Sequence, residues 1–188
     1  PTMPIIGINT GHLGFFQEIM PSMLDDFIFN YSQGKYQLQP LSTVKVTVRT
    51  KDGVHEHVGL NEVLVTGDST RSIHLNISIG GSFIERFSGD GILIATPAGS
   101  TAYNYSLGGS IVDPRLKILQ VTPIAPMNTT AYRSFTSSIL LPCDLSLGIV
   151  PDHADDPCKL CVVYDGVSCE YTDIEEMEVS FSDIEVNL

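Results

Sequence analysis

From Gln37 onward, the pattern of apolar and polar residues changes to a period of two. In the clearest case, Val44, Val46 and Val48 alternate with polar residues, and Lys51-Asp-Gly53 supplies a turn into a return strand. Alternation of this kind indicates a half-buried β-strand, and an Asp-Gly step after it is typical of a hairpin. Further strands are predicted at residues 62–66, 73–79, 82–87, 91–95, 116–122, 138–141, 161–164 and 177–181.

Helical spacing is confined to two short segments. Met23, Phe27 and Tyr31 recur at intervals of four and lie on one side of a predicted helix over residues 22–31. A second short helix is predicted within residues 96–109, where a polar loop precedes it and two glycines end it. Many short strands with only two helix candidates indicate a mainly β, sandwich-like fold with two short helices.

The chain begins with an apolar run, Pro4-Ile-Ile-Gly-Ile8, followed by a glycine-rich stretch. The run reads as a short buried strand that enters a turn. Such a beginning is typical of a chain that is already in mid-fold.

The composition indicates a globular protein without a membrane span. With 188 residues, 43% of them hydrophobic, and no long apolar run, the chain can bury a core. Nothing near Pro1 resembles a signal peptide, which favours a cytoplasmic location. The formal net charge of −12 argues against a nucleic-acid partner, because binding a phosphate backbone requires a basic surface.

Four cysteines raise the question of a metal or disulfide. Cys158 and Cys161 have the two-residue spacing found in zinc sites, and His153 lies nearby. No second pair with this spacing accompanies them, and Cys161 falls inside a predicted strand, so we interpret the cysteines as buried free thiols and predict no metal site. A metal bound by Cys158 and Cys161 is the open alternative. Disulfides are disfavoured in the cytoplasm.

The segment with the most chemistry runs over residues 96–109. Its first half places the hydroxyls of Thr96, Ser100 and Thr101 around Gly99, and a glycine lets the backbone approach a ligand closely. Side chains of this kind also cap helices. Taken alone, the segment is therefore either a ligand-contacting loop or a capped turn.

Other polar groups stand where turns meet strands. Asn61 and Glu62 place an amide beside a carboxylate, a pair that can hold the hydroxyls of a ribose or the amine of an adenine. Asp90 lies in a Ser-Gly-Asp-Gly turn and can accept similar hydrogen bonds, although Asp between glycines is also a standard turn residue. Taken alone, the turn at Asn61 is an ordinary one, and the turn at Asp90 can be ordinary as well.

Taken in order, these elements resemble the NAD kinase family over most of the chain. The resemblance is carried by Gly7-Ile-Asn-Thr-Gly-His-Leu-Gly-Phe15, Asn61-Glu62, Gly89-Asp-Gly91, Thr96-Pro-Ala-Gly-Ser-Thr-Ala-Tyr103 with Ser106 and Gly108-Gly109, Thr122-Pro123 with Pro126, and Tyr164-Asp-Gly166. One such motif would be weak, but their order and spacing together are specific.

The resemblance implies a transferase that moves the terminal phosphate of ATP, or of inorganic polyphosphate, to the 2′-hydroxyl of the adenosine ribose of NAD, which yields NADP. Magnesium or another divalent cation assists by neutralising phosphate charge. The family has an N-terminal α/β domain for the phosphate donor and a mainly β C-terminal domain for NAD, and it assembles as homodimers or homotetramers. Residues 1–188 would then be the NAD-binding domain, with residues 1–20 a remnant of its junction with an N-terminal domain that is largely absent.

By the same resemblance, the NAD-binding positions of the family fall on residues of these motifs. Asn61 and Glu62 would address the adenosine part of NAD, and Asp90 would hold the nicotinamide end, in the same or a neighbouring subunit. The full expected NAD-binding set is Asn61, Glu62, Arg71, Asp90, Thr101, Ala102, Tyr103, Asn104, Tyr105, Ser106 and Ala125. No catalytic residue and no metal ligand is expected in the chain.

The sequence departs from the family pattern at three points. Ser88 stands where many relatives carry Arg, and Val167 stands where some place Gln, so polar contacts made there are expected to be missing. The family's Gly-Gly-Asp-Gly motif, whose Asp is proposed to activate the 2′-hydroxyl, should precede Gly7 and is not in the chain. Because a general base is required, we predict that these 188 residues alone bind NAD weakly or not at all and do not turn over.

Two alternatives stay open. A non-catalytic dinucleotide-binding or regulatory module without the phosphate-donor domain would share the NAD motifs. A lipid or sphingoid kinase relative would share the donor-domain chemistry, but residues 96–109 and the lack of a basic or amphipathic membrane face count against it.

Overall fold

The computed structural model describes residues 3–10, 19–67, 71–152 and 159–188. The chain divides into two compact units. The larger unit is Ser42–Ile184, and the smaller consists of the described parts of Pro1–Leu41 together with Glu185–Leu188. All of the predicted NAD-binding residues belong to the larger unit.

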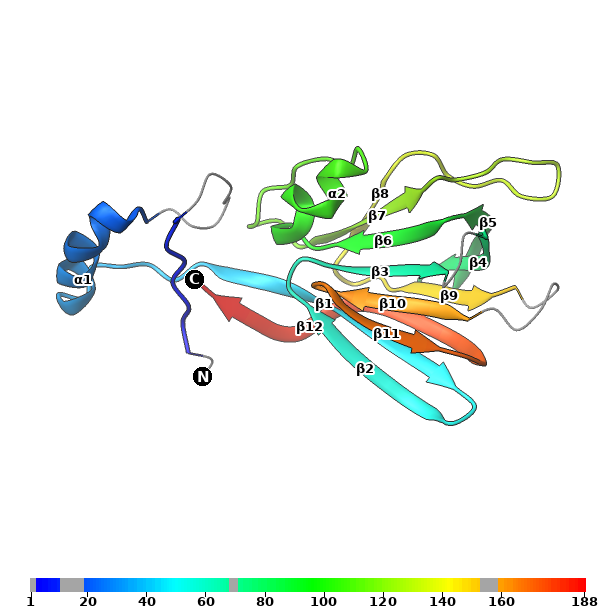
Figure 1. Cartoon of the computed structure of the whole chain (residues 1–188), viewed down its shortest axis with the longest axis horizontal. Coiled ribbons are helices and arrows are strands. Elements are labelled where there is room, and N and C mark those ends of the chain that lie inside the picture. Colours follow the sequence, from blue (N-terminus) through cyan, green and yellow to red (C-terminus); the bar gives the residue numbers. More distant parts are fainter. Residues whose placement is uncertain (1–2, 11–18, 68–70, 153–158) are drawn as a thin grey trace. The chain divides into compact units, whose positions relative to one another are not determined.

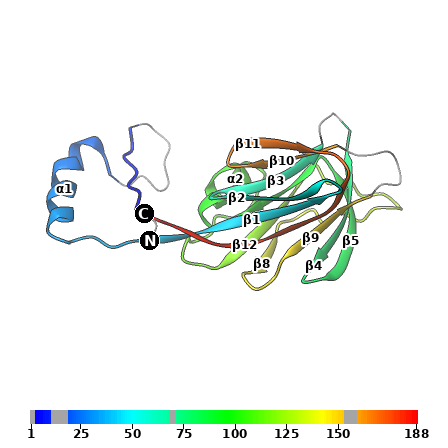
Figure 2. The same ribbon diagram turned by 90° about the horizontal axis from the view of Figure 1, so that it is seen from below.

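Two six-stranded sheets build the larger unit, and the pairs with a described register are antiparallel (Figures 1 and 2). The first sheet has the order β2 (Gly53–Gly59), β1 (Pro40–Thr50), β12 (Ile174–Asn187), β9 (Leu147–Pro151), β4 (Ile73–Ile79) and β5 (Ser82–Gly89). The second sheet has the order β11 (Val167–Tyr171), β10 (Leu160–Tyr164), β3 (Glu62–Gly67), β6 (Gly91–Ala95), β7 (Ile118–Ile124) and β8 (Ile139–Pro142).

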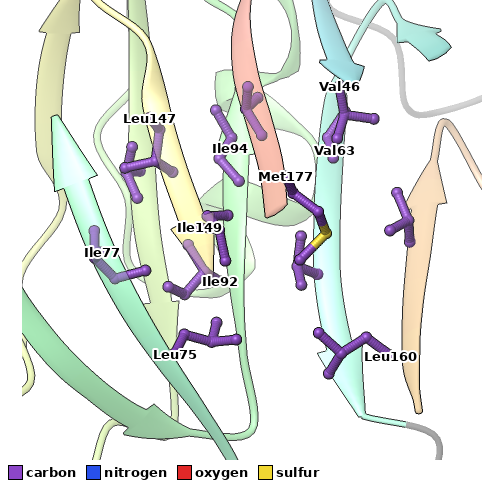
Figure 3. Packing of buried hydrophobic residues seen from close by; sticks show 14 of the residues in the cluster. Val46, Val63, Leu75, Ile77, Ile92, Ile94, Leu147, Ile149, Leu160 and Met177 are labelled. Atoms are coloured by element: carbon purple, nitrogen blue, oxygen red, sulfur yellow. The ribbon is translucent and has the colours of Figure 1, made fainter. Parts of the chain in front are cut away.

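The hydrophobic core lies between the two sheets, where their inner faces meet. Val46 and Met177 from the first sheet and Val63, Ile92 and Leu160 from the second are fully buried and point into this space (Figure 3). Burying an aliphatic side chain of this size contributes about 1.5–3 kcal/mol. The sandwich predicted from the alternating pattern is confirmed.

The central strand β6 is buried along its whole length, on both faces. One face meets the core, and residues of η2 (Ala98–Thr101) and α2 (Tyr103–Ser106) contact the strand as well. This explains why its sequence, Gly-Ile-Leu-Ile-Ala, is continuously apolar instead of alternating. The covering segment is the one predicted to carry the chemistry.

Every strand predicted after residue 37 is present, and two further strands within the described residues were missed. The hairpin of β1 and β2 closes with Thr50 opposite Gly53, as the Asp-Gly step predicted. β7 is displaced by two residues, and β12 is much longer than the predicted segment. The missed strands are β9, which contains Gly148, and β11, whose side chains are largely polar and exposed. A β-carbon at Gly148 would stand 2.3 Å from Ser78 Oγ, so this glycine permits a close approach that the periodicity does not report.

Both predicted helices are found. η1 (Pro21–Met23) leads into α1 (Leu24–Ser32), whose Phe27 and Tyr31 rings lie 6.0 Å apart on one side, as predicted. The second helix, α2, is short, and Gly108 ends it with a φ of 82°. Such a left-handed conformation favours glycine.

The smaller unit corrects one expectation. Residues 4–8 do not form a buried strand: Ile5, Ile6 and Ile8 are 57%, 44% and 37% exposed, and only an isolated bridge joins Ile8 to Ile19. An apolar run predicts a strand, but burial requires neighbouring strands and a covering layer, which the run does not encode. The glycine-rich turn predicted next lies largely outside the described residues. The interpretation of residues 1–20 as a domain junction stays a prediction.

Candidate functional site

The Thr96 segment, residues 96–109, leaves the end of β6 and packs against residues 60–62, the Asn61 turn. The Thr96 N–H donates to Asn61 O at 2.9 Å, and the Thr96 hydroxyl donates to Leu60 O at 2.6 Å. The same hydroxyl accepts from the N–H of Gly99 at 3.0 Å, which satisfies a donor at the start of η2. The buried Thr96 side chain therefore links the two segments by hydrogen bonds.

Gly99 makes this packing possible. A β-carbon at this position would stand 1.9 Å from Asn61 O and 2.7 Å from Asn61 Cα, distances that no side chain tolerates. The sequence predicted that Gly99 permits a close approach to a ligand. In the structure the close approach is made to the backbone of Asn61, so Gly99 brings the two motifs together.

Asn104 holds the short helix from inside. It is fully buried, its amide donates to Ser100 O at 3.1 Å and to Ser110 O at 3.4 Å, and its carbonyl accepts from the Thr122 hydroxyl at 2.7 Å. A β-carbon at Gly109 would lie 2.3 Å from Asn104 Oδ1. All of these partners are internal, so the geometry gives Asn104 a supporting place, and its predicted contact with NAD stays a prediction.

The outer side of the Thr96 segment is open. Thr101 and Ala102 are half-buried, Ser106 is exposed, and Tyr103 and Tyr105 are 44% and 59% exposed. Residues two positions apart on a helix do not share a face, so the two rings do not form one stacking surface. The segment thus offers two separate aromatic faces beside a hydroxyl.

The Asn61 turn is also held from its other side, by Asp165. The carboxylate of Asp165 accepts from the N–H groups of Leu60 at 2.5 Å, Asn61 at 2.8 Å and Glu62 at 3.3 Å. Asp165 and Gly166 form the two-residue loop between β10 and β11, and their φ values of 45° and 84° are those of a type I′ hairpin turn.

The Glu62 side chain is the chemically unusual group of this turn. Its Oε2 atom is buried and has no hydrogen-bond partner. Burial, and next the charge of Asp165, raise the pKa of the Glu62 carboxyl from 4.5 to about 7. An unpaired buried carboxyl oxygen with a shifted pKa is typical of a place where a ligand hydroxyl or a water binds.

Asp90, Ala125 and Arg71 form a second group. The Asp90 N–H donates to Ile124 O at 2.9 Å, its carbonyl accepts from the Thr66 hydroxyl at 2.9 Å, and its side chain is exposed. Ala125 has a φ of 44°, a conformation that costs a non-glycine residue about 1–2 kcal/mol. Arg71 is exposed and stands two residues before β4.

The two groups lie at opposite ends of β6, where α2 stands at one end and the turn from β5 at the other (Figure 1). In the register of β3 with β6, Glu62 is opposite Ala95 and Thr66 is opposite Gly91. Five residues at about 3.3 Å each place the two ends roughly 13–16 Å apart. The structure therefore brings Asn61 and Glu62 together with the Thr96 segment and leaves Asp90, Ala125 and Arg71 at the far end.

The two side chains that depart from the family pattern are placed very differently. Ser88 is 1% exposed; its N–H donates to Ser134 Oγ at 2.9 Å, and its own hydroxyl is buried without a partner. Val167 is 51% exposed and presents an apolar surface. Ser88 is thus covered from solvent, whereas Val167 is open.

In the described parts of the chain, no set of three His, Cys, Asp or Glu side chains is placed to hold a metal ion. Cys143, Cys161 and Cys169 are free thiols, as predicted. Their predicted burial is wrong for Cys143, which is exposed in a turn, and the other two are half-buried. Cys158 and His153 lie outside the described residues.

The smaller unit contains a pocket of about 480 Å³ among Ile5, Phe27, Tyr31 and Leu38. None of the predicted NAD-binding residues lines it. The helices in the described ranges are all too short to cross a bilayer.

Comparison with known proteins places this geometry in a family. The model of the ATP-NAD kinase C-terminal domain matches residues 60–187, which contain both groups of predicted site residues. The chain belongs to the NAD kinase family. The NAD kinase of Finegoldia magna is 38% identical over 189 residues, covering 99% of this chain and 69% of the relative. That of Staphylococcus carnosus is 32% identical and covers 96% of this chain and 67% of the relative.

Solved structures share the fold. Yeast NADH kinase complexed with NADH has a TM-score of 0.85 and 23% identity, and the match covers 99% of this chain and 54% of the yeast protein. An NAD kinase from Archaeoglobus fulgidus in complex with ATP has a TM-score of 0.78 and 24% identity, over 98% of this chain and 68% of that protein. The chain thus spans about half to two thirds of the length of these NAD kinase family proteins.

Asp165 is the main residue that sequence reasoning did not assign. Tyr164-Asp-Gly166 was recognised as a motif, but its role was not visible, because Asp165 lies 104 residues beyond Asn61. The available signal was an Asp-Gly step between two strand-like runs, which predicts a tight hairpin and an exposed carboxylate at its tip.

Proposed function

We propose that this chain supplies the NAD-binding part of an enzyme that phosphorylates the adenosine 2′-hydroxyl of NAD and so makes NADP. Membership of the NAD kinase family supports the reaction class. The observation that carries the site is the Asn61 turn, where an amide stands next to a carboxyl whose Oε2 is buried and unpartnered. A vicinal diol is the kind of ligand that satisfies such a pair.

In this proposal the Asn61 amide meets the adenosine part of NAD as donor and acceptor, and Glu62 receives a ribose hydroxyl. Tyr103 packs its exposed ring against a base. The remaining near-end positions of the site are Thr101, Ala102, Ser106 and Tyr105, with Asn104 supporting them from inside. Thr96 and Asn104 are already hydrogen-bonded within the protein and hold this side of the site in place. Such preorganisation lowers the entropy cost of binding.

The phosphate donor, ATP or inorganic polyphosphate, belongs to the whole protein. The Archaeoglobus relative was solved with ATP. Transfer of a phosphoryl group requires charge neutralisation by a divalent cation such as magnesium. The described residues hold no set of three His, Cys, Asp or Glu side chains placed for an ion. The 188 residues also contain no Gly-Gly-Asp-Gly, and we expect no turnover from the isolated chain.

The far group, Asp90 with Ala125 and Arg71, is proposed to complete the site of a neighbouring subunit in a homodimer or homotetramer. Its distance of roughly 13–16 Å from the Asn61 turn, at opposite ends of a fully buried strand, argues against a shared local pocket. The exposed Asp90 carboxylate and the carbonyl edge at Ala125 are accessible to the nicotinamide half of a dinucleotide bound next door.

The test is a coupled NADP-formation assay on the full-length gene product, with wild type compared with Asn61→Ala and Asp90→Ala. We expect each variant to raise the KM for NAD by about tenfold or more, because each loses hydrogen bonds to the ligand. Thermal midpoints should stay close to wild type.

Asp144→Ala serves as the control, because Asp144 is an exposed turn carboxylate between β8 and β9. It should leave both activity and KM unchanged. If Asn61→Ala and Asp90→Ala both keep normal activity and NAD affinity, the site assignment is wrong. NAD binding without any NADP formation by the full-length product would instead favour a non-catalytic dinucleotide-binding module.

A further inference from the structure

The Asn61 turn is held from two sides, and only one of them belongs to the Thr96 segment. On the carbonyl side, Thr96 donates to Leu60 O and Asn61 O. On the amide side, the three consecutive N–H groups of the turn all point at the carboxylate of Asp165. The Asp165 N–H donates back to Glu62 O at 3.4 Å.

We propose that Asp165 is a positioning residue for NAD binding: its carboxylate holds the backbone of the Asn61 turn and so sets the directions in which the Asn61 and Glu62 side chains leave it. This inference rests on the proposed NAD-binding function. Hydrogen bonds to an ionised acceptor are about twice as strong as neutral ones. Three of them on successive residues leave the turn little conformational freedom.

The hairpin alone does not require an aspartate at this position. A φ of 45° is tolerated by Asn and Asp and is easiest for Gly, so Gly-Gly would close the same type I′ turn. What Asp165 adds is the carboxylate, which reaches across to the Asn61 turn. A β-carbon at Gly59 would stand 2.8 Å from Glu62 O and 3.4 Å from Asp165 Oδ1, so the turn is built closely around this side chain.

Asp165 also acts on Glu62 through its charge. After burial, the negative charge of Asp165 is the second cause that raises the pKa of Glu62 to about 7. The residue that aims the Glu62 carboxyl therefore also shifts its proton affinity.

The chain contains a matched control in Asp173. It is an exposed aspartate with a φ of 53° in the connection from β11 to β12, and its carboxylate pairs with Lys51 at 3.3 Å. It shares residue type and backbone conformation with Asp165, but within the described residues its carboxylate pairs with Lys51 and not with the Asn61 turn. Differences between the two positions therefore report the contact with residues 60–62.

The test compares Asp165→Gly and Asp165→Asn with Asp173→Gly and Asp173→Asn in the full-length gene product, with NAD as the probe. Glycine keeps the left-handed conformation and deletes the carboxylate, and Asn keeps one acceptor oxygen without charge. We expect NAD affinity to fall about tenfold in Asp165→Gly and about threefold in Asp165→Asn, and to stay within about twofold in both Asp173 variants. Amide hydrogen exchange over residues 58–64 should accelerate only in the Asp165 variants.

Wild-type NAD affinity in Asp165→Gly overturns the positioning role. If Asp165→Gly does not fold, Asp165→Asn decides: unchanged affinity together with unchanged exchange overturns it equally. Asn61→Ala, measured in parallel, separates this inference from the proposed function. Loss of binding with Asn61→Ala but not with the Asp165 variants refutes the positioning role alone. Full binding by Asn61→Ala refutes the NAD site, and the inference with it.

Discussion

The two ends of β6 are built on different principles. At the Asn61 end, hydroxyls, amides and carboxylates are tied to one another, and Glu62 Oε2 is left buried without a partner. At the Asp90 end, the carboxylate is exposed and the neighbouring Ala125 is held in a left-handed conformation. At one end most polar groups are hydrogen-bonded within the protein, and at the other the polar side chain faces solvent. Under the proposed function, the Asn61 end would be a preformed part of the NAD site, and the Asp90 end a surface that acts on a neighbouring subunit.

The physical reason lies in what covers each end. The short helices of the Thr96 segment contact β6, and Thr96, just before them, donates to the carbonyls of Leu60 and Asn61. At the other end the chain turns from β5 into β6, where the backbone N–H of Asp90 donates to Ile124 O and its carbonyl accepts from the Thr66 hydroxyl. Buried polar groups must find partners, whereas exposed ones are satisfied by water. The following predictions test this contrast.

The largest effect is expected from a side chain at Gly99. Gly99→Ala places a carbon 1.9 Å from Asn61 O, so the Thr96 segment and the Asn61 turn must separate. Overpacking of this kind destabilises a structure by about 3 kcal/mol. If the whole cost disrupts the NAD-binding conformation, NAD affinity falls about a hundredfold. Isothermal titration calorimetry would measure the NAD affinity, and a thermal melt would measure the stability of the folded protein.

Gly108→Ala is the control for that substitution. Gly108 lies in the same segment with open space around it, so an alanine there adds only backbone strain at a φ of 82°. Its NAD affinity should stay near wild type. Equal losses in both variants would mean that the contact with Asn61 has no special importance.

The next largest effect is expected from removing the buried Asn104 side chain, which supports the Thr96 segment from inside. Asn104→Ala removes the amide that donates to the Ser100 carbonyl and deprives Thr122 of an acceptor, whereas the Ser110 carbonyl keeps its hydrogen bond from Gln120. We expect a loss of about 1–3 kcal/mol in the free energy of unfolding, measured by urea titration. Tyr105→Ala, on the exposed side, should change it by about 0.5 kcal/mol or less. Equal stability of the two variants would contradict a preorganised wall.

The open end should behave in the opposite way. Asp90→Asn removes an exposed charge, so unfolding should change by about 0.5 kcal/mol or less, while NAD affinity of the assembled protein falls about tenfold. Subunit mixing sharpens the contrast. Reassembly of Asn61→Ala with Asp90→Asn subunits should recover activity, because one site of each mixed pair is intact. No recovery would mean that both ends serve the same subunit.

The smallest effect concerns pH. Because the folded state raises the pKa of Glu62 from 4.5 to about 7, it binds the proton more tightly than the unfolded chain does. The resulting stability is present below pH 4.5 and is lost as the pH rises to about 7. Glu62 is partly exposed, so the change is on the order of 1 kcal/mol after solvent screening.

Glu62→Gln should remove this dependence from urea midpoints measured across the same pH range. His57 has the opposite slope, since burial and His55 lower its pKa, and its contribution is lost as the pH falls below 6.5. It is present in both proteins, so the difference between them isolates Glu62. Identical pH profiles would show that Glu62 does not hold an extra proton in the folded state.

Much of the fold was readable from local pattern. The alternation at Val44, Val46 and Val48 predicted β1, and the following Asp-Gly step predicted the hairpin to β2. β9 was not predicted because Gly148 interrupts its apolar pattern. The glycine is needed there for close packing against Ser78, which is far away in sequence. The predicted strand at residues 4–8 was wrong because burial depends on neighbours that a run of apolar residues does not specify.

For the candidate site, the motifs named the segments but not where the tertiary structure places them. Sequence placed Asn61, Asp90 and Asn104 in one functional set, each as a polar residue near a turn. The structure separates them into a residue on the fastened turn, one at the far end of a strand, and one buried inside the wall. Nothing local distinguishes these three environments.

By itself, the sequence determined the family, the strands with clear periodicity and the kinds of polar group available. Local side-chain chemistry and backbone preference act over a few residues, and these features depend on nothing more. Only the tertiary structure decided that Gly99 packs on Asn61, that Asp165 fastens the same turn, and that Asp90 stands at the other end. Antiparallel register brings residues up to about a hundred positions apart into hydrogen-bond contact, and burial then decides which polar groups are consumed within the protein and which remain for a ligand.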